Sequence, residues 1–342
     1  MAIKLLSLLA LAGLAVLTSA QQAHATHTCR KLPAICDEDT QEARRRPECR
    51  RRLPVHRIDE ADSRFDAKAC AWAKDNLEIV SGNEPPPGTF GETVLIMPPQ
   101  GTQPICSGVL IASRVVLTAR HCLKRAAPIA TQGSRVVFGD HASADPTVVR
   151  LVDAPPAVPP THLANLYPDV ILLRLSVPAP TKPVAIATSQ LIKEAVAVRA
   201  VGFGDTGKAT DGRKLYGNLI AVSNACEGTV QGKTDSQYYG CNAGGELVAA
   251  GIPPPGTQRP TDTCFGDSGG PIFVVQPSEG ATSKTFDDAM LAGRYFLAGT
   301  TARGIGGLRC GGAGIYTLTT GDTLRWIQRT AEAWGQRVQV AP

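Results

Sequence analysis

Residues 261–271 read TDTCFGDSGGP, and this stretch decides which architecture the rest of the chain can have. Its centre, GDSGG, fits the pattern G-x-S-x-G, which is typical of a nucleophilic serine on a sharp turn. A serine hydroxyl is a weak nucleophile at neutral pH, so Ser268 needs a histidine base held in place by a carboxylate. The positions of the histidines therefore test each architecture.

None of the six histidines follows Ser268; they are His24, His27, His56, His121, His141 and His162. An α/β-hydrolase needs its histidine after the serine, so that architecture is excluded. His121 ends a β-branched run and precedes Cys122, where a disulfide would hold it firmly. We expect His141 and His162 to be surface residues, because the loops around them offer no comparable support.

The composition and the strand pattern predict an all-β fold. Aromatic residues make up 5% of the chain, whereas Gly (34) and Pro (26) are frequent, which favours turn-rich β structure. From residue 79 onward, short β-branched runs alternate with turn signals, as in barrels or sandwiches. The expected strands are 93–97, 108–111, 115–118, 135–138, 148–152, 170–175, 195–201, 219–222, 271–275, 295–300 and 314–318. Only 322–334 has helical spacing, with Leu324, Ile327 and Trp334 along one face.

The first 25 residues are typical of a secretory signal peptide. One early lysine precedes an apolar core and a cleavage signature at 23–25, with 18–20 as the alternative site. The apolar core is too short for a stable membrane span, which argues against an uncleaved anchor, and no later segment is long enough either. We therefore expect a soluble protein that is secreted to the extracellular space or the periplasm. The net charge of +5 makes no case for nucleic-acid binding.

The ten cysteines are expected to form disulfides, because an exported chain enters an oxidising compartment. The spacings typical of zinc sites are absent from the sequence, so no metal and no cofactor is expected. Residues 26–78 contain Cys29, Cys36, Cys49 and Cys70, with few large apolar residues. This segment is predicted to depend on disulfides for fixed structure. Its arginines at 44–46 and 50–52 are interpreted as a solvated face, with polyanion binding as the alternative.

Six segments together resemble the chymotrypsin family of serine proteases. CSGVLIASRVVLTARHC (106–122), YPDVILLRL (167–175) and TDTCFGDSGGP are similar to its histidine, aspartate and serine segments, in the family's order. IVSG (79–82), GFG (202–204) and GIYT (314–317) are similar to its mature amino terminus, second barrel and last strand. The resemblance implies two antiparallel six-stranded Greek-key β-barrels with a C-terminal helix, and a protease domain over 79–342.

The resemblance also assigns catalytic roles. It makes Ser268 the nucleophile, His121 the general base and then acid, and Asp169 the carboxylate that orients His121. Asp153 is the alternative to Asp169, although it precedes a proline-rich loop rather than an apolar run. The amides of Gly266 and Ser268 would form the oxyanion hole.

Activation is expected to require cleavage between Glu78 and Ile79. In the family, the new α-ammonium group pairs with a carboxylate that here corresponds to Asp267, because a buried charge needs a partner. Residues 26–78 would then be a propeptide that keeps the chain in zymogen form. The sequence Asn-Leu-Glu before Ile79 departs from the basic residue usual at this place, so an enzyme that cuts after basic residues would not make the cut itself.

The resemblance implies the disulfides Cys106–Cys122, Cys226–Cys241 and Cys264–Cys310, which leaves the four propeptide cysteines in one of three pairings. Asp262, six residues before Ser268, corresponds to the specificity pocket floor of members that cut after Arg or Lys. Gly304 and Gly314 correspond to the pocket walls. If Asp262 lay outside the pocket, a preference for large apolar residues would be expected instead.

Three departures from the family pattern bear on function. Ala302 lacks the serine hydroxyl that normally donates to the triad aspartate. Arg303 replaces an indole and puts a cation near the pocket mouth, where it would repel basic residues and favour acidic ones. Arg120 replaces the usual alanine before His121. These departures keep open a catalytically impaired, protease-shaped binding protein. The main expectation is a monomeric endopeptidase whose partners are protein or peptide substrates and its own propeptide.

Overall fold

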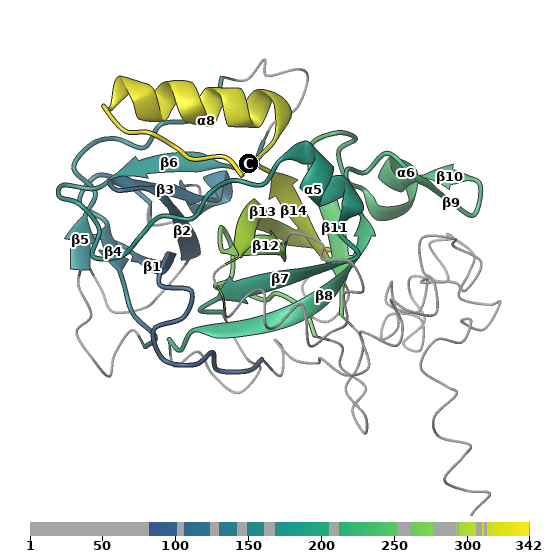
Figure 1. Ribbon diagram of the computed structural model, residues 1–342, viewed down its shortest axis with the longest axis horizontal. Coiled ribbons are helices and arrows are strands. Elements are labelled where there is room, and N and C mark those ends of the chain that lie inside the picture. Colours follow the sequence, from purple (N-terminus) through teal and green to yellow (C-terminus); the bar gives the residue numbers. More distant parts are fainter. Residues whose placement is uncertain are drawn as a thin grey trace, which may run out of the picture.

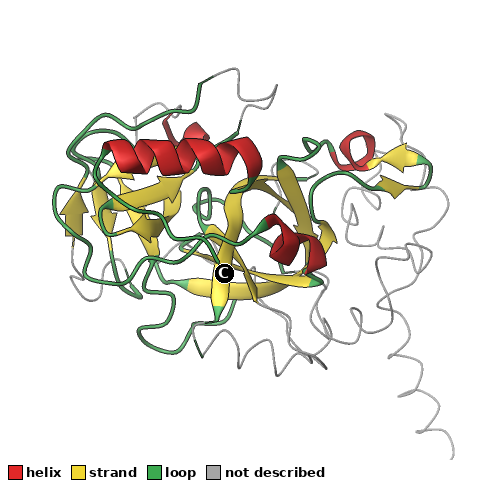
Figure 2. Cartoon of the chain, turned by 45° about the horizontal axis from the view of Figure 1, so that its top comes forward, coloured by secondary structure: helices red, strands yellow, loops and turns green. Residues whose placement is uncertain are grey.

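The computed structural model describes residues 82–100, 106–123, 130–141, 149–160, 168–204, 212–251, 261–275, 292, 294–305, 310 and 313–341. The predicted signal peptide and propeptide, residues 1–78, lie outside the described residues, and so does Ile79. Strands make up most of the described regular structure (Figure 2), as predicted for an all-β fold.

The first half of the protein forms a six-stranded antiparallel sheet in the order β5-β4-β1-β2-β3-β6. Its strands are β1 (Thr93–Met97), β2 (Cys106–Ala112), β3 (Val115–Thr118), β4 (Arg135–Val137), β5 (Val149–Leu151) and β6 (Ile171–Arg174). Backbone contacts join the two edge strands where they end. Val152 bridges Leu175, and the amide of Ser176 donates to the Leu151 carbonyl at 2.8 Å. The sheet therefore curls until its edges meet at one end.

The second half forms a closed six-stranded barrel in the order β11-β14-β13-β12-β7-β8. Its strands are β7 (Ala197–Gly202), β8 (Leu215–Ser223), β11 (Glu246–Ala250), β12 (Pro271–Val275), β13 (Tyr295–Gly304) and β14 (Gly314–Leu318). The two six-stranded units and the C-terminal helix α8 (Gly321–Ala333) match the predicted architecture.

Most strands are buried on both faces, because each unit packs one face inward and another against its neighbour. In β2, Leu110 belongs to the interior of the first unit, whereas Val109 and Ile111 belong to the core between the units. Phe273 and Leu297 reach the same shared core from the second barrel. This explains why the strand sequences are continuous apolar runs rather than alternating ones.

Helix α8 lies over β3 and β6 (Figure 1). Trp326, Ile327 and Ala331 join the core between the units from this helix. The chain then returns along the segment that connects the two units, where Ile186 forms a parallel bridge with Val340. The C-terminal segment thus fastens both halves together.

A buried ion pair also joins the two units. Lys214, just before β8, has a fully buried side chain, and its ammonium donates to Asp140 Oδ1 and to the Phe90 carbonyl, both at 3.0 Å. Burial lowers the pKa of Lys214, and the Asp140 carboxylate opposes that shift. Glu92 is buried nearby, so this junction holds three ionisable groups.

The structure contains elements that the sequence analysis did not expect. Strand β11 reads ELVAA and has only one β-branched residue, which is why its pattern was missed. Helices α5 (Ser189–Glu194) and α6 (Asp235–Tyr239) are short, and the hairpin β9 (Thr229–Val230) and β10 (Lys233–Thr234) projects with α6 from the barrel (Figure 1). The capping box of Thr234 and Gln237, closed by Gly240 in left-handed conformation, is the sequence signal that would have found α6.

Candidate active site

The pairing of β3 with β6 brings His121 and Asp169 together. Thr118 at the end of β3 lies opposite Ile171 at the start of β6. The residue just beyond one antiparallel strand therefore meets the residue just before the other. His121 occupies a short 3-10 helix, η3 (Arg120–Leu123), directly after β3.

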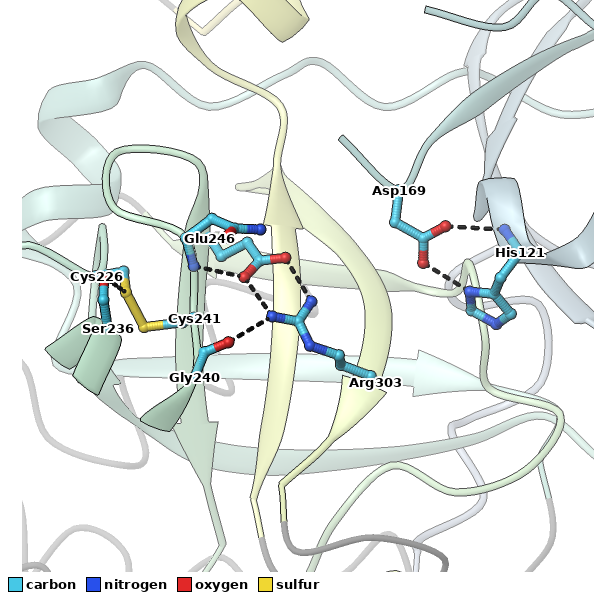
Figure 3. A network of polar contacts seen from close by, with 9 residues as sticks. His121, Asp169, Cys226, Ser236, Gly240, Cys241, Glu246 and Arg303 are labelled. Carbon is cyan, nitrogen blue, oxygen red and sulfur yellow. Dashed lines mark hydrogen bonds and ion pairs between the residues drawn. A yellow bond between two sulfur atoms is a disulfide. The ribbon is translucent and has the colours of Figure 1, made fainter. Parts of the chain in front are cut away.

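The histidine and the carboxylate make two hydrogen bonds (Figure 3). Nδ1 of His121 lies 2.6 Å from Asp169 Oδ2, and the backbone amide of His121 donates to Oδ1 at 2.8 Å. Both side chains are partly exposed, at 30% for His121 and 22% for Asp169. A carboxylate on Nδ1 favours the tautomer that leaves Nε2 free to accept a proton.

Asp153, the alternative carboxylate, lies elsewhere. It accepts from Arg114 at 3.0 Å and from Arg174 at 2.8 Å. The geometry thus favours Asp169 as the partner of His121. Of the other candidate histidines, His141 forms an isolated bridge with Arg213, and His162 lies outside the described residues.

The turn that carries Ser268 lies between the two units. On one side, the amide of Ser107 in β2 donates to the Ser268 carbonyl at 2.9 Å. The Sγ atom of Cys122, the residue after His121, lies 4.0 Å from the same oxygen. On the other side, the amide of Gly269 donates to the Thr301 carbonyl in β13 at 2.8 Å. The serine backbone is therefore anchored beside the histidine segment.

Glycines are required on both sides of Ser268. Gly266 has φ +101°, and a Cβ there would lie 2.9 Å from the Cα of Gly204. Gly269 has φ +80°, and a Cβ there would lie 2.5 Å from the amide nitrogen of Ala119. Side chains at either place would be strained and would also push the turn away from its neighbours.

The backbone amides of this turn differ in whether they donate to a protein acceptor. Those of Asp267, Gly269 and Gly270 donate to protein carbonyls. The amides of Gly266 and Ser268 donate to no acceptor in the described part of the chain. Two neighbouring donors of this kind are suited to a negatively charged oxygen.

Asp267 points into the protein and is 4% exposed. Its Oδ1 accepts from the amide of Gly204 and its Oδ2 from the amide of Cys264, both at 2.8 Å. A Cβ on Gly202 would lie 2.1 Å from Oδ1, and one on Gly204 would lie 2.4 Å from Cγ. The GFG segment therefore has glycines where the Asp267 carboxylate needs room. Ile79, its expected partner, lies outside the described residues.

Asp262 is buried at 2% exposure and lies within electrostatic reach of the Tyr316 hydroxyl. Burial raises the pKa of Tyr316 well above its usual value, and the charge of Asp262 adds to this effect. A Cβ on Gly314 would lie 2.5 Å from the Tyr316 hydroxyl oxygen, whereas one on Gly304 would have only the Ala313 carbonyl within 4 Å, at 3.9 Å. Gly304 at the end of β13 pairs with Gly314 at the start of β14.

Arg303, the cation that the sequence places near the pocket mouth, is paired with a carboxylate. Its Nη1 donates to Glu246 Oε1 at 2.6 Å, and its Nη2 donates to Oε2 at 2.7 Å and to the Gly240 carbonyl at 2.9 Å (Figure 3). A bidentate pair of this kind neutralises most of the charge at a distance. No local sequence pattern indicates this partner, because Glu246 is 57 residues away and lies in β11, a strand that the sequence did not predict.

Three disulfides hold the segments around the site. They are Cys106–Cys122, Cys226–Cys241 and Cys264–Cys310, the pairs that the resemblance implies. The first joins β2 to the residue after His121, and the third fixes the start of the serine turn. Among the described residues, no cluster of three or more histidine, cysteine or acidic side chains could hold a metal ion.

No helix among the described residues is both long and apolar enough to cross a bilayer.

Ala302 is 7% exposed and carries no hydroxyl, so the two hydrogen bonds to Asp169 in this region come from His121.

The sequence matches known proteins over the same region. The model of the family described as trypsin matches residues 79–315. The chain is 30% identical over 236 residues to vitamin K-dependent protein C of Rattus norvegicus, covering 65% of this chain and 45% of the relative. It is 29% identical over 209 residues to a trypsin of Saccharopolyspora erythraea, covering 60% of this chain and 86% of the relative. It is 25% identical over 302 residues to transmembrane protease serine 9 of Rattus norvegicus, covering 83% of this chain. The chain spans 25% of the length of this last relative.

Proposed function

The chain belongs to the trypsin family of serine proteases, and from this premise we propose that it is a secreted endopeptidase that cleaves after Arg or Lys. Ser268 is the nucleophile, His121 the general base and Asp169 the carboxylate that orients His121. The observation that carries this assignment is the 2.6 Å contact between His121 Nδ1 and Asp169 Oδ2, beside the anchored serine turn.

Hydrolysis proceeds in two steps through an acyl-enzyme. His121 takes the proton of the Ser268 hydroxyl as the oxygen attacks the scissile carbonyl, and then gives that proton to the leaving amine. Water repeats the attack on the ester and releases the acid. The amides of Gly266 and Ser268 stabilise the oxyanion, and each such donor contributes about 3–4 kcal/mol to the transition state.

Activation requires cleavage between Glu78 and Ile79. The new ammonium group of Ile79 pairs with Asp267, whose buried carboxylate accepts hydrogen bonds from the backbone amides of Gly204 and Cys264. Amides offset part of the cost of burying a carboxylate, and a cation offsets far more. The paired carboxylate then holds the Gly266 and Ser268 amides in place. Residues 26–78 act as a propeptide, which stays a possible partner after cleavage.

Asp262 selects the substrate residue on the acyl side of the scissile bond. Its carboxylate is buried, and a cationic substrate side chain would form an ion pair with it. Gly304 and Gly314 line the walls: Gly304 leaves open space for a long side chain, and Gly314 lets the Tyr316 hydroxyl approach. Changing Asp262 to Ser should abolish cleavage of arginyl peptides while Ser268 remains reactive.

Fluorophosphonate labelling tests the catalytic assignment. Protein processed so that it begins at Ile79 should be labelled, and Ser268→Ala and His121→Ala should not be. Ser113→Ala is a matched control, because Ser113 is exposed and its hydroxyl donates to the Gln336 side chain. Labelling that survives Ser268→Ala would refute the nucleophile. A processed chain that binds peptides but is neither labelled nor able to cleave them would instead be a protease-shaped binding protein.

The uncleaved chain serves as the second comparison. We expect labelling to be at least tenfold slower before the Glu78–Ile79 bond is cut. Equal labelling of intact and processed protein would refute the activation proposal without affecting the triad.

A further inference from the structure

Arg303 lies on the part of β13 that runs past the serine turn. Thr301 exchanges two backbone hydrogen bonds with that turn, accepting from Gly269 at 2.8 Å and donating to Gly270 at 2.9 Å. After Thr301, β13 pairs with β14 on one side. In the described residues no strand pairs with its other side.

A substrate at Ser268 is expected to run along this free edge. An extended peptide adds to an open strand through backbone hydrogen bonds, and its side chains alternate between the two faces. Gly304 pairs with Gly314, which lies against the Tyr316 hydroxyl, and Asp262 acts electrostatically on that hydroxyl. The substrate residue before the scissile bond is therefore expected to use the face of Gly304. The second and fourth residues before the bond then lie on the face of Arg303, since neighbours in a strand point to opposite sides.

Arg303 and Glu246 are arranged as an outer cation above an inner anion. The Arg303 side chain is 41% exposed, whereas the Glu246 side chain is 5% exposed. Glu246 Oε2 also accepts from the Asn242 amide at 2.8 Å, so both carboxylate oxygens are satisfied. Of the five N–H donors of Arg303, three are used by Glu246 and Gly240. The remaining donors include Nε.

We infer that the Arg303–Glu246 pair determines the preference of the protease at the second and fourth residues before the scissile bond, and that it favours acidic side chains there. This rests on the proposed function. Arg303 supplies a local donor to a substrate carboxylate. Glu246 cancels most of its longer-range field, so the preference is modest and short-ranged.

The two partners are expected to act in opposite directions. Arg303→Leu uncovers the Glu246 carboxylate, which attracts basic side chains. Glu246→Gln keeps the shape and a hydrogen-bond acceptor but leaves the Arg303 charge uncompensated. A residue that only supports the fold would not give opposite shifts, because damage to either partner would lower the cleavage of all peptides alike.

The experiment uses protein processed at Ile79 and peptides that share an arginine before the scissile bond. The residue four positions before that bond is Glu or Lys, and the measured quantity is the ratio of kcat/KM for the two peptides. Exposed ion pairs change such ratios by about two- to fivefold, which sets the expected scale. The wild-type ratio should exceed one, Glu246→Gln should raise it, and Arg303→Leu should lower it below one.

Arg325→Leu is the matched control, because it removes an arginine from the surface pair with Asp322 on α8. Its ratio should equal that of the wild type. Salt near 1 M should bring the wild-type ratio close to one, since the Debye length falls to about 3 Å. If Arg303→Leu does not fold, Glu246→Gln and the salt dependence still give the answer.

Equal ratios in the wild type and both variants would overturn the inference while leaving the protease activity intact. Shifts of both variants in the same direction would also overturn it. Failure of every protein, wild type included, to cleave peptides or react with a fluorophosphonate would overturn the proposed function and this inference with it.

Discussion

His121 holds Asp169 at both carboxylate oxygens: its ring nitrogen Nδ1 lies 2.6 Å from Oδ2, and its own backbone amide donates to Oδ1 at 2.8 Å. Among the described residues, both hydrogen bonds to the Asp169 carboxylate come from His121, and Ala302 has no hydroxyl to add a third.

Asp169→Asn should lower kcat about 10⁴-fold, because the amide favours the wrong histidine tautomer. Its melting temperature should stay close to that of the wild type, since the side chain is partly exposed and keeps its shape. Kinetics on an arginyl peptide and a thermal scan measure the two quantities. Asp153→Asn is the control, and a loss of kcat in that variant instead would give the orienting role to Asp153.

Gly266→Ala should abolish most activity, with a loss of at least about 100-fold in kcat, because it moves an oxyanion donor. The new Cβ combines a left-handed φ of +101° with a 2.9 Å contact to the Cα of Gly204. Gly232→Ala is the matched control, because Gly232 has φ +76° but nothing within 4 Å of the added Cβ. The control should lose about 1–2 kcal/mol of stability and no activity. Equal kcat values in the two variants would contradict the oxyanion role.

Asp140→Asn should destabilise the protein more than Lys214→Met. The first change leaves the fully buried ammonium without its counter-ion, which costs about 3 kcal/mol. The second removes the buried charge and leaves Asp140, whose side chain is 39% exposed, in contact with water. Urea denaturation of both variants measures the difference, with Asp322→Asn as a surface control. The reverse order would mean that the pair is not desolvated at Lys214.

Glu92→Gln should stabilise the protein at neutral and alkaline pH but not in acid. Burial raises the pKa of Glu92 above its ordinary value of 4.5, and its own amide, Tyr295 and Lys214 offset this only in part. The folded state thus binds more protons than the unfolded state just above pH 4.5, so stability falls as the pH rises through the folded pKa. Gln does not ionise, so the variant does not lose this stability as the pH rises.

The measurement is the unfolding free energy of Glu92→Gln minus that of the wild type, determined at several pH values between about pH 4 and pH 8. We expect that difference to grow with pH. Glu332→Gln, on the exposed side of α8, is the matched control. A constant difference for Glu92→Gln would mean that Glu92 titrates alike in both states.

The sequence predicted those strands whose conformation is determined by their own residues. Thr93–Met97, Val115–Thr118 and Pro271–Val275 are strands with the expected bounds, because β-branched runs between turns determine them. Strand β11 was not predicted, because its ELVAA sequence is held in a strand by pairing with β8 and β14 rather than by its own β propensity. The short helix α6 was not predicted either, because it is marked by its capping residues and not by a helical spacing of apolar residues.

Part of the candidate site could be predicted from the sequence, and part could not. The positions of His121, Asp169 and Ser268 follow from motifs and chain order, and the structure brings the histidine and aspartate into contact. The partner of Arg303 does not follow from the sequence. Ion pairs between residues on different strands depend on sheet register, and no local pattern encodes that register across 57 residues.

The turn around Ser268 bonds to Ser107 in one unit and to Thr301 in the other. A growing polypeptide therefore cannot anchor Ser268, the proposed nucleophile, while only the first unit has been synthesised. The histidine and aspartate are in place by the end of β6, yet the serine is anchored only after Thr301 has been made and β13 has paired. For the protease proposed above, the order of synthesis therefore delays activity until late in translation.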